Sequence, residues 1–68
     1  MSNAPQTITI GRTTYSATPS KLGYTFTGPR GGTLDGIRNV HSGVIYVMQG
    51  ARTIARLSDA GGEWRHLS

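Results

Sequence analysis

Hydrophobic and polar residues alternate along most of the chain, and this period of two predicts antiparallel β-strands rather than helices. The pattern is strongest in residues 44–67, which contain a continuous apolar run at 44–48 and the only Trp. Because this run has no polar face, it predicts a central strand that is covered on both sides. We therefore expect residues 44–67 to form a three-stranded antiparallel meander around which the rest of the domain is organised.

Two turns divide this predicted meander. Gly50 followed by Ala51 places glycine at the first central position of a two-residue hairpin turn, as a type II′ turn requires. Residues 59–62, Asp-Ala-Gly-Gly, provide the second reversal. The register of the first turn predicts the core residues of the meander, which are Val44, Tyr46, Met48, Leu57 and, beyond the second turn, Trp64. It also predicts an uncovered apolar strip on the opposite face, formed by Ile45, Val47 and Ile54 and bordered by Arg52 and Arg56.

The N-terminal half repeats the same alternation. Residues 7–16 predict a hairpin around Gly11, and residues 22–27 predict a further strand. The residues between them read as a connector, because Pro19 cannot donate a hydrogen bond to a strand ladder. The inward-facing residues predicted here are Ile8, Ile10, Tyr15, Leu22, Tyr24 and Phe26. Threonine and serine hydroxyls dominate the other face of the first hairpin.

Residues 28–32, Gly-Pro-Arg-Gly-Gly, form the most unusual local segment. Its glycines allow successive amides to point to one side, with Arg30 at the tip, and such a loop is able to hold a phosphate. The segment matches neither the P-loop nor the dinucleotide fingerprint, because both the glycine spacing and a following helix are missing. We favour a plain hairpin connection.

Residues 33–42 admit two interpretations. Apolar residues recur there at every third position, as on one face of a short helix. Gly36 and Asn39 are poor helix formers, however, and a strand with a bulge at Gly36 accounts for the same residues. A helical spacing also occurs in residues 51–60. We retain strands in both segments.

Together these patterns predict an all-β fold, with one short helix as the open alternative: a small antiparallel sheet or an SH3- or OB-like barrel of five to six strands. We expect a flexible N-terminal tail at residues 1–6 and a single small β domain at residues 7–68. A chain of 68 residues buries only a thin core, with a stability on the order of 3–5 kcal/mol. The absence of Cys and of any apolar stretch of ~20 residues predicts a soluble cytoplasmic protein.

Positive charge is the strongest signal in the composition. Seven Lys and Arg residues against three Asp and Glu give a net charge of +4. The cations are spread along the chain, so they form a patch only if the fold gathers them. The candidate binding residues are Arg30, Arg52, Arg56, Arg65, Arg12 and Arg38. Solubility alone is the alternative explanation for the same charges.

Catalytic chemistry has little support in the sequence. His41 and His66 are the only imidazoles, Ser42 adjoins the first, and the three carboxylates are scattered. No metal-ligand spacing and no nucleophile motif connects these groups. We therefore predict a protein that is not an enzyme and that uses no cofactor or metal. Trp64 is expected in the core, with an exposed base-stacking platform as the alternative.

Two classes of function remain after this exclusion. In the first, a small basic module contacts nucleic acid through arginines on a sheet face, since arginine makes planar, bidentate phosphate and base contacts. In the second, an accessory or inhibitor protein of the phage or mobile-element type covers an acidic surface of a larger partner. Pairing with a second copy is also open, because a small domain cannot cover both faces of its sheet. We favour nucleic acid.

Overall fold

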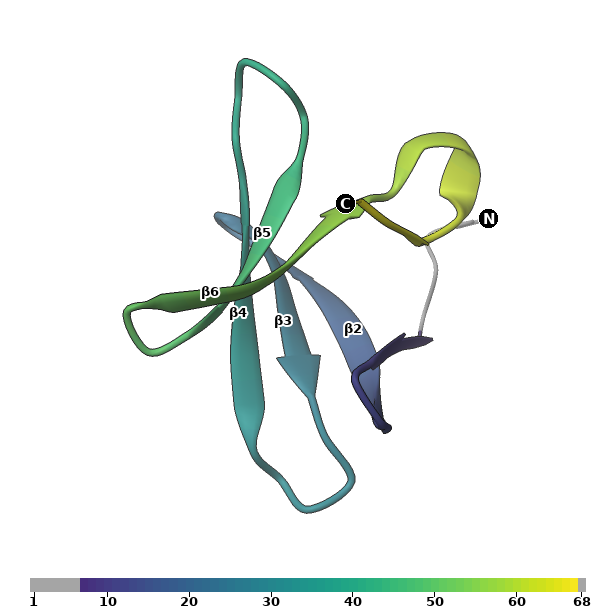
Figure 1. Ribbon diagram of the computed structural model, residues 1–68, viewed down its shortest axis with the longest axis vertical. Coiled ribbons are helices and arrows are strands. Elements are labelled where there is room, and N and C mark those ends of the chain that lie inside the picture. Colours follow the sequence, from purple (N-terminus) through teal and green to yellow (C-terminus); the bar gives the residue numbers. More distant parts are fainter. Residues whose placement is uncertain (1–6, 68) are drawn as a thin grey trace.

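The computed structural model describes residues 7–67 as short strands joined by tight turns (Figure 1). The elements are β1 (Thr7–Ile10), β2 (Thr13–Ser20), β3 (Gly23–Thr27), β4 (Thr33–Arg38), β5 (Ile45–Gln49), β6 (Arg52–Ser58), the 3-10 helix η1 (Ala60–Gly62) and β7 (Arg65–His66). The predicted all-β fold is confirmed, with seven strands where we expected five or six. The predicted tail at residues 1–6 lies outside the described residues, as does residue 68.

Each strand pairs in antiparallel fashion with its neighbours in sequence, so the seven strands form one up-and-down sheet. The sheet curls into a half-barrel, in agreement with the predicted barrel-like class. The His66 side chain bridges the seam between the last strand and the first, because its Nε2 lies 2.7 Å from the carbonyl oxygen of Thr9. A side chain thus closes part of a gap that the two-residue strand β7 is too short to close.

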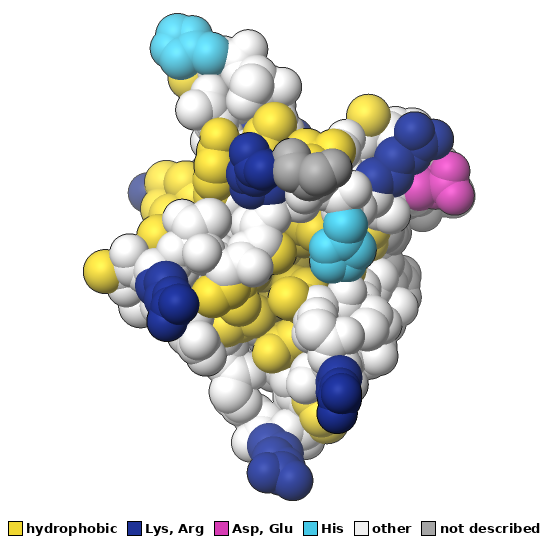
Figure 2. Space-filling view, viewed as in Figure 1, with side chains coloured by type: hydrophobic (Ala, Val, Ile, Leu, Met, Phe, Trp, Pro, Cys, Tyr) yellow, Lys and Arg dark blue, Asp and Glu magenta, His cyan; other side chains and the backbone are white. Residues whose placement is uncertain are grey.

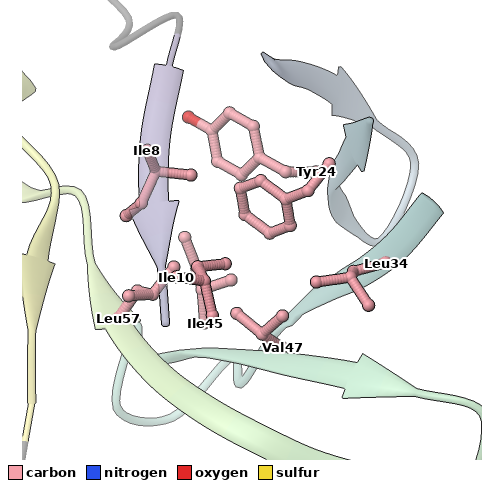
Figure 3. Close-up of a cluster of buried hydrophobic side chains, with 8 residues drawn as sticks. Ile8, Ile10, Tyr24, Leu34, Ile45, Val47 and Leu57 are labelled. Atoms are coloured by element: carbon pink, nitrogen blue, oxygen red, sulfur yellow. The ribbon is translucent and has the colours of Figure 1, made fainter. Parts of the chain in front are cut away.

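The concave side of the sheet holds one hydrophobic core (Figure 3). Its buried residues are Ile8, Ile10, Tyr24, Phe26, Leu34, Ile45, Val47 and Leu57. Trp64 packs against this core, with its ring edge-on to Tyr24 at a centroid distance of 4.8 Å and to Phe26 at 5.6 Å. The predicted core placement is confirmed for the isoleucines of β1 and the aromatic residues of β3, whereas Trp64 is only partly buried and packs against the edge of the core.

The predicted register of the β5–β6 hairpin is wrong beyond its first two pairs. Those pairs follow the prediction and end with Met48 opposite Thr53. The next pair is Val47 with Ala55, so Ile54 is an extra residue that forms a β-bulge. Side chains alternate between the two faces along a strand. One inserted residue in β6 therefore moves every later residue of β6 to the other face relative to its predicted partner in β5.

This exchange reverses our prediction of which face of β5 is buried. Ile45 and Val47, predicted to be uncovered, are 0% exposed and form part of the core wall. Val44, Tyr46 and Met48, predicted to be core, remain partly exposed. The bulge thus buries two purely aliphatic side chains. It also leaves the Tyr46 hydroxyl within reach of water, whereas a buried hydroxyl without a hydrogen-bond partner would cost stability.

The glycine turns occur where they were predicted. Gly11 and Gly50 have φ values of +66° and +65°, and no described residue other than glycine has a positive φ. A positive φ at the first central position alone is the type II′ geometry. Residues 28–32 form the hairpin connection that we favoured, closed by a 2.8 Å hydrogen bond from the Gly28 amide to the Gly32 carbonyl.

The predicted connector before β3 is instead the end of a long strand. β2 continues to Ser20 and pairs Pro19 with Tyr24. Proline is tolerated there because β1 pairs with β2 only as far as Ser16, so no strand within residues 7–67 faces the missing N–H. Leu22 consequently lies in the β2–β3 turn and is 65% exposed, whereas we predicted it on the inner face.

Residues 33–38 are a strand, but the predicted bulge at Gly36 is absent. Gly36 pairs regularly with Tyr24 on one side and Val47 on the other. A Cβ at this position would lie 2.6 Å from Cε2 of Phe26 and 3.1 Å from Cγ2 of Ile45. Glycine is required here because the Phe26 ring occupies the space of a side chain.

Candidate functional site

Alternating strand direction brings three arginine-bearing turns to one end of the half-barrel. The β1–β2 turn, the β3–β4 loop and the β5–β6 turn each follow an odd-numbered strand, so they share an end of the meander. Arg12 and Arg30 lie in the first two connections, Arg52 directly follows the third, and all three residues are exposed. The described chain extends only 29 × 29 × 24 Å, so one short polymer is able to contact all three.

A hollow of about 530 Å³ opens at this end, between the β1–β2 hairpin, the β3–β4 loop and the end of β5. Residues that line it include Thr13, Tyr15, Arg30, Thr33 and Gln49. We call this hollow, together with Arg12, Arg30 and Arg52, the cationic mouth. In Figure 2 separate cationic side chains stand around the lower part of the molecule, with an apolar area open between them.

Tyr15 supplies the aromatic surface of the cationic mouth. Its half-buried ring packs on the core from one side and lines the hollow with the other. A Cβ at position 28 would lie 3.2 Å from Cε2 of Tyr15, so Gly28 lets the ring lie against the base of the β3–β4 loop. The sequence predicts Tyr15 on the apolar face of its hairpin. It does not predict that Tyr15 lines the hollow, because the hollow is formed together with the neighbouring β3–β4 loop.

Two of the three acidic residues lie away from the cationic mouth. Asp59 and Glu63 belong to the β6–β7 connection, which follows an even-numbered strand and therefore lies at the opposite end. Asp35 lies within β4, paired with Thr25 and Met48. Among residues 7–67, two of the three carboxylates thus lie at the end opposite the arginines of the mouth, which favours positive potential at the mouth.

Within the β3–β4 loop, two of the backbone amides already donate hydrogen bonds. The Gly28 amide donates to the Gly32 carbonyl, and the Gly31 amide donates to the Gly28 carbonyl at 3.1 Å. These bonds leave those two amides unable to cradle a phosphate. The loop therefore does not present a run of successive free amides, and Arg30 is its one charged side chain.

The bulge in β6 separates two arginines that we predicted on one face. Arg52 lies opposite Gln49, whereas Arg56 lies opposite Tyr46. Residues 46 and 49 point to opposite faces of β5, because side chains alternate along a strand. Arg56 is therefore on the outer surface of the sheet. Arg65 pairs with Ser58 near the opposite end of the molecule, so neither Arg56 nor Arg65 joins the cationic mouth.

Arg38, the sixth predicted binding residue, is held in a polar network with Asp59 and Tyr24. Its Nη2 donates to Oδ2 of Asp59 at 2.7 Å, and its Nη1 donates to Oδ1 at 3.2 Å. The Tyr24 hydroxyl donates to the same Oδ2 at 3.0 Å. The network ties the start of β3 and the end of β4 to the segment after β6, so the role of Arg38 is to join strands.

Both ionisable partners of Arg38 are perturbed by these contacts. The hydrogen bonds from Arg38 hold the pKa of Asp59 below its ordinary value of 3.8. Burial raises the pKa of Tyr24 above its ordinary value of 10.0, and the hydrogen bond to Asp59 adds to that rise. No local pattern indicates this network, because Asp59 is separated by 35 residues from Tyr24 and by 21 from Arg38.

We expect Asp59→Asn to lower the free energy of unfolding at neutral pH by about 1–2 kcal/mol, since the Arg38 side chain is 38% exposed and water screens the pair. Because the pKa of Asp59 is lowered in the folded state, the ionised carboxylate contributes its full stabilisation above its ordinary pKa of 3.8. This stabilisation is lost as the pH falls through the lowered pKa of the folded state. Urea unfolding between neutral pH and about pH 2.5 should therefore show the wild type approaching Asp59→Asn in stability as the pH falls.

Glu63→Gln is the matched control for this prediction. It also removes one carboxylate from the β6–β7 connection, and Glu63 forms no salt bridge among the described residues. We expect it to leave the neutral-pH stability within about 0.5 kcal/mol of the wild type. Equal losses in the two variants would contradict a stabilising role of the Arg38–Asp59 pair.

The remaining polar candidates do not assemble into a second site. His41 lies in the β4–β5 loop, while His66 is at the seam with Thr9. No group of three or more His, Cys, Asp or Glu within residues 7–67 is placed to hold a metal ion. No helix in that same range is long and apolar enough to cross a membrane.

Comparison with known proteins leaves the cationic mouth as the main guide to function. No protein-family model matches the chain, and neither the curated proteins nor the solved structures give a significant match.

Proposed function

We propose that the protein is a small, non-enzymatic module that binds single-stranded nucleic acid at the cationic mouth. The observation that carries this proposal is the placement of Arg12, Arg30 and Arg52 at one end of the half-barrel, where Arg30 and Tyr15 line a hollow. Arginines near an exposed aromatic ring are the combination with which small β domains hold a phosphate backbone and stack a base.

The shape of the mouth favours a single strand over a duplex. A hollow of about 530 Å³ beside a half-exposed tyrosine accepts an unstacked base, and a paired base is not available to enter it. The hydroxyls of Thr13 and Thr33 and the amide of Gln49 offer hydrogen-bond donors and acceptors to a base edge or a sugar. We infer sequence-tolerant binding, because stacking and phosphate contacts do not depend on base identity.

The choice of arginine favours nucleic acid over an acidic protein surface. All three cations of the mouth are arginines, whose planar fork binds phosphate in a bidentate manner and stacks on bases. The alternative, an accessory or inhibitor protein that covers an acidic partner, would use the same three residues but leaves the hollow and Tyr15 without a role. A cytoplasmic location belongs to the proposal, since nucleic acid is accessible there.

Titration of a fluorescently labelled, mixed-sequence oligonucleotide of about 12 nucleotides tests the proposal. We expect the anisotropy to rise at low salt and the affinity to fall as salt is added. Three phosphate contacts predict a slope of about −2 for the logarithm of the binding constant against the logarithm of salt concentration, at ~0.7 per contact for single strands.

A matched duplex of the same sequence should bind more weakly than the single strand. Absence of binding at low salt would refute the nucleic-acid proposal. Recovery of one acidic protein in stoichiometric amount on the immobilised chain, together with that absence, would support the inhibitor alternative instead.

A further inference from the structure

The end of the half-barrel opposite the cationic mouth exposes a cluster of large apolar side chains. Val40 is 86% exposed, Leu22 is 65% exposed and Ile37 is 38% exposed. Leu22 lies between two shallow hollows: one extends to Val40 and Arg38, and the other to Ile37 and Asp35. We call the surface formed by Lys21, Leu22, Asp35, Ile37, Arg38 and Val40 the apolar end.

The backbone that carries these side chains is held by hydrogen bonds. In the β4–β5 loop, Oδ1 of Asn39 accepts from the amides of His41 and Ser42 at 2.9 and 3.1 Å. The Gly43 amide donates to the Asn39 carbonyl at 2.7 Å and fixes the loop that presents Val40. The Leu22 carbonyl accepts from the Arg38 amide at 2.8 Å, which fixes the turn beside β4. A partner therefore meets a pre-organised surface and orders little of it on binding.

Charge is balanced at the apolar end, although the whole chain carries +4. Asp59 neutralises Arg38 in the only salt bridge found among residues 7–67. Lys21 and Asp35 are both exposed, and both line the hollow between Leu22 and Ile37. The excess positive charge lies on the other arginines, so two copies are able to meet at this end without net repulsion.

We propose that the apolar end is the interface of a two-fold dimer of this chain. A two-fold interface is self-complementary, so a surface that carries one free cation and one free carboxylate beside an apolar centre fits a second copy of itself. Leu22 and Val40 of the two copies pack together, and Lys21 of each copy pairs with Asp35 of the other. The two cationic mouths then lie at the far ends of the dimer.

Charge argues for a second copy over an acidic partner protein. An acidic partner would be attracted to the arginine-rich part of the molecule and not to the end where charges cancel. The thin core of a 68-residue domain also benefits from apolar surface buried between copies. The proposed dimer does not depend on nucleic-acid binding and is tested independently of it.

Sedimentation equilibrium of the wild type from about 10 µM to about 1 mM tests the dimer, over the range of weak association. We expect the weight-average mass to rise from 7.3 kDa towards twice that value. Val40→Asp should raise the dissociation constant at least about tenfold, since it places a charge in the apolar centre. Because Val40 is 86% exposed, the variant should keep the circular dichroism spectrum of the wild type.

Two further variants separate this interface from general charge effects. Ala51→Asp adds the same charge in an exposed turn at the opposite end and should leave the dissociation constant unchanged. Lys21→Asp should weaken the dimer, and the double exchange Lys21→Asp with Asp35→Lys should restore it. A wild type that remains monomeric at about 1 mM would overturn the dimer, and equal effects of Val40→Asp and Ala51→Asp would overturn the interface.

Discussion

Phe26→Ala should leave the protein largely unfolded at 25 °C. Its side chain is 0% exposed and lies within 6.1 Å of the Tyr24 ring and 5.6 Å of the Trp64 ring, centroid to centroid. Truncation of a buried Phe costs about 3–5 kcal/mol, which equals the whole stability expected for a domain of this size. The loss should be near the upper limit, because Gly36 has no side chain that is able to fill the cavity.

Tyr46→Ala is the matched control for this substitution. It removes another aromatic ring from a strand, but one that lies on the outer face opposite Arg56 and is partly exposed. We expect a loss of about 1–2 kcal/mol, with a cooperative urea transition retained. The two results together test the bulge at Ile54, because the register without a bulge would bury Tyr46. Unfolding of Tyr46→Ala with survival of Phe26→Ala would contradict the described register.

The sequence predicted the parts of the fold that depend on local rules. Strict alternation in β1 and β3 identified Ile8, Ile10, Tyr24 and Phe26 as inward-facing, because a strand has a fixed period of two. Glycine at the first central position identified the turn at Gly50, because that position needs a positive φ. These features follow from the residues within each hairpin.

Features that depend on distant residues could not be predicted in this way. The bulge at Ile54 reverses β5 although the turn was placed correctly, and nothing local distinguishes the two registers. Gly36 looked like a bulge because its reason is the Phe26 ring, which comes from a different strand. The position of Leu22 was predicted wrongly because proline at position 19 is acceptable beyond Ser16, where β2 no longer pairs with β1.

The candidate site was predicted in its residue type but not in its location. The sequence singled out six arginines, and the fold gathers Arg12, Arg30 and Arg52 while Arg38 is held by Asp59. The strand order alone would have indicated which arginines lie at the same end of the sheet, because turns that follow alternate strands of a meander share an end. This assignment requires the correct number of strands, and we expected five or six strands instead of seven.

The double variant Arg30→Ala, Arg52→Ala should lower the affinity for the single-stranded oligonucleotide about 25-fold at ~0.1 M salt. Loss of one phosphate contact reduces the number of released counterions by ~0.7, which lowers the affinity about fivefold at that salt concentration. The factors for two lost contacts multiply to about 25-fold. The salt slope should fall by about 1.4 for the same reason. Both residues are exposed, so the stability to urea should not change by more than about 0.5 kcal/mol.

The most direct test of the cationic mouth compares this variant with Arg56→Ala, Arg65→Ala in the same titration. Both double variants remove two positive charges, but Arg56 and Arg65 lie outside the mouth. We predict a loss of about 25-fold for the first pair and less than about threefold for the second, because only the first pair contacts the strand. Equal losses for the two pairs would mean that binding follows net charge alone, and would contradict a nucleic-acid site at the cationic mouth.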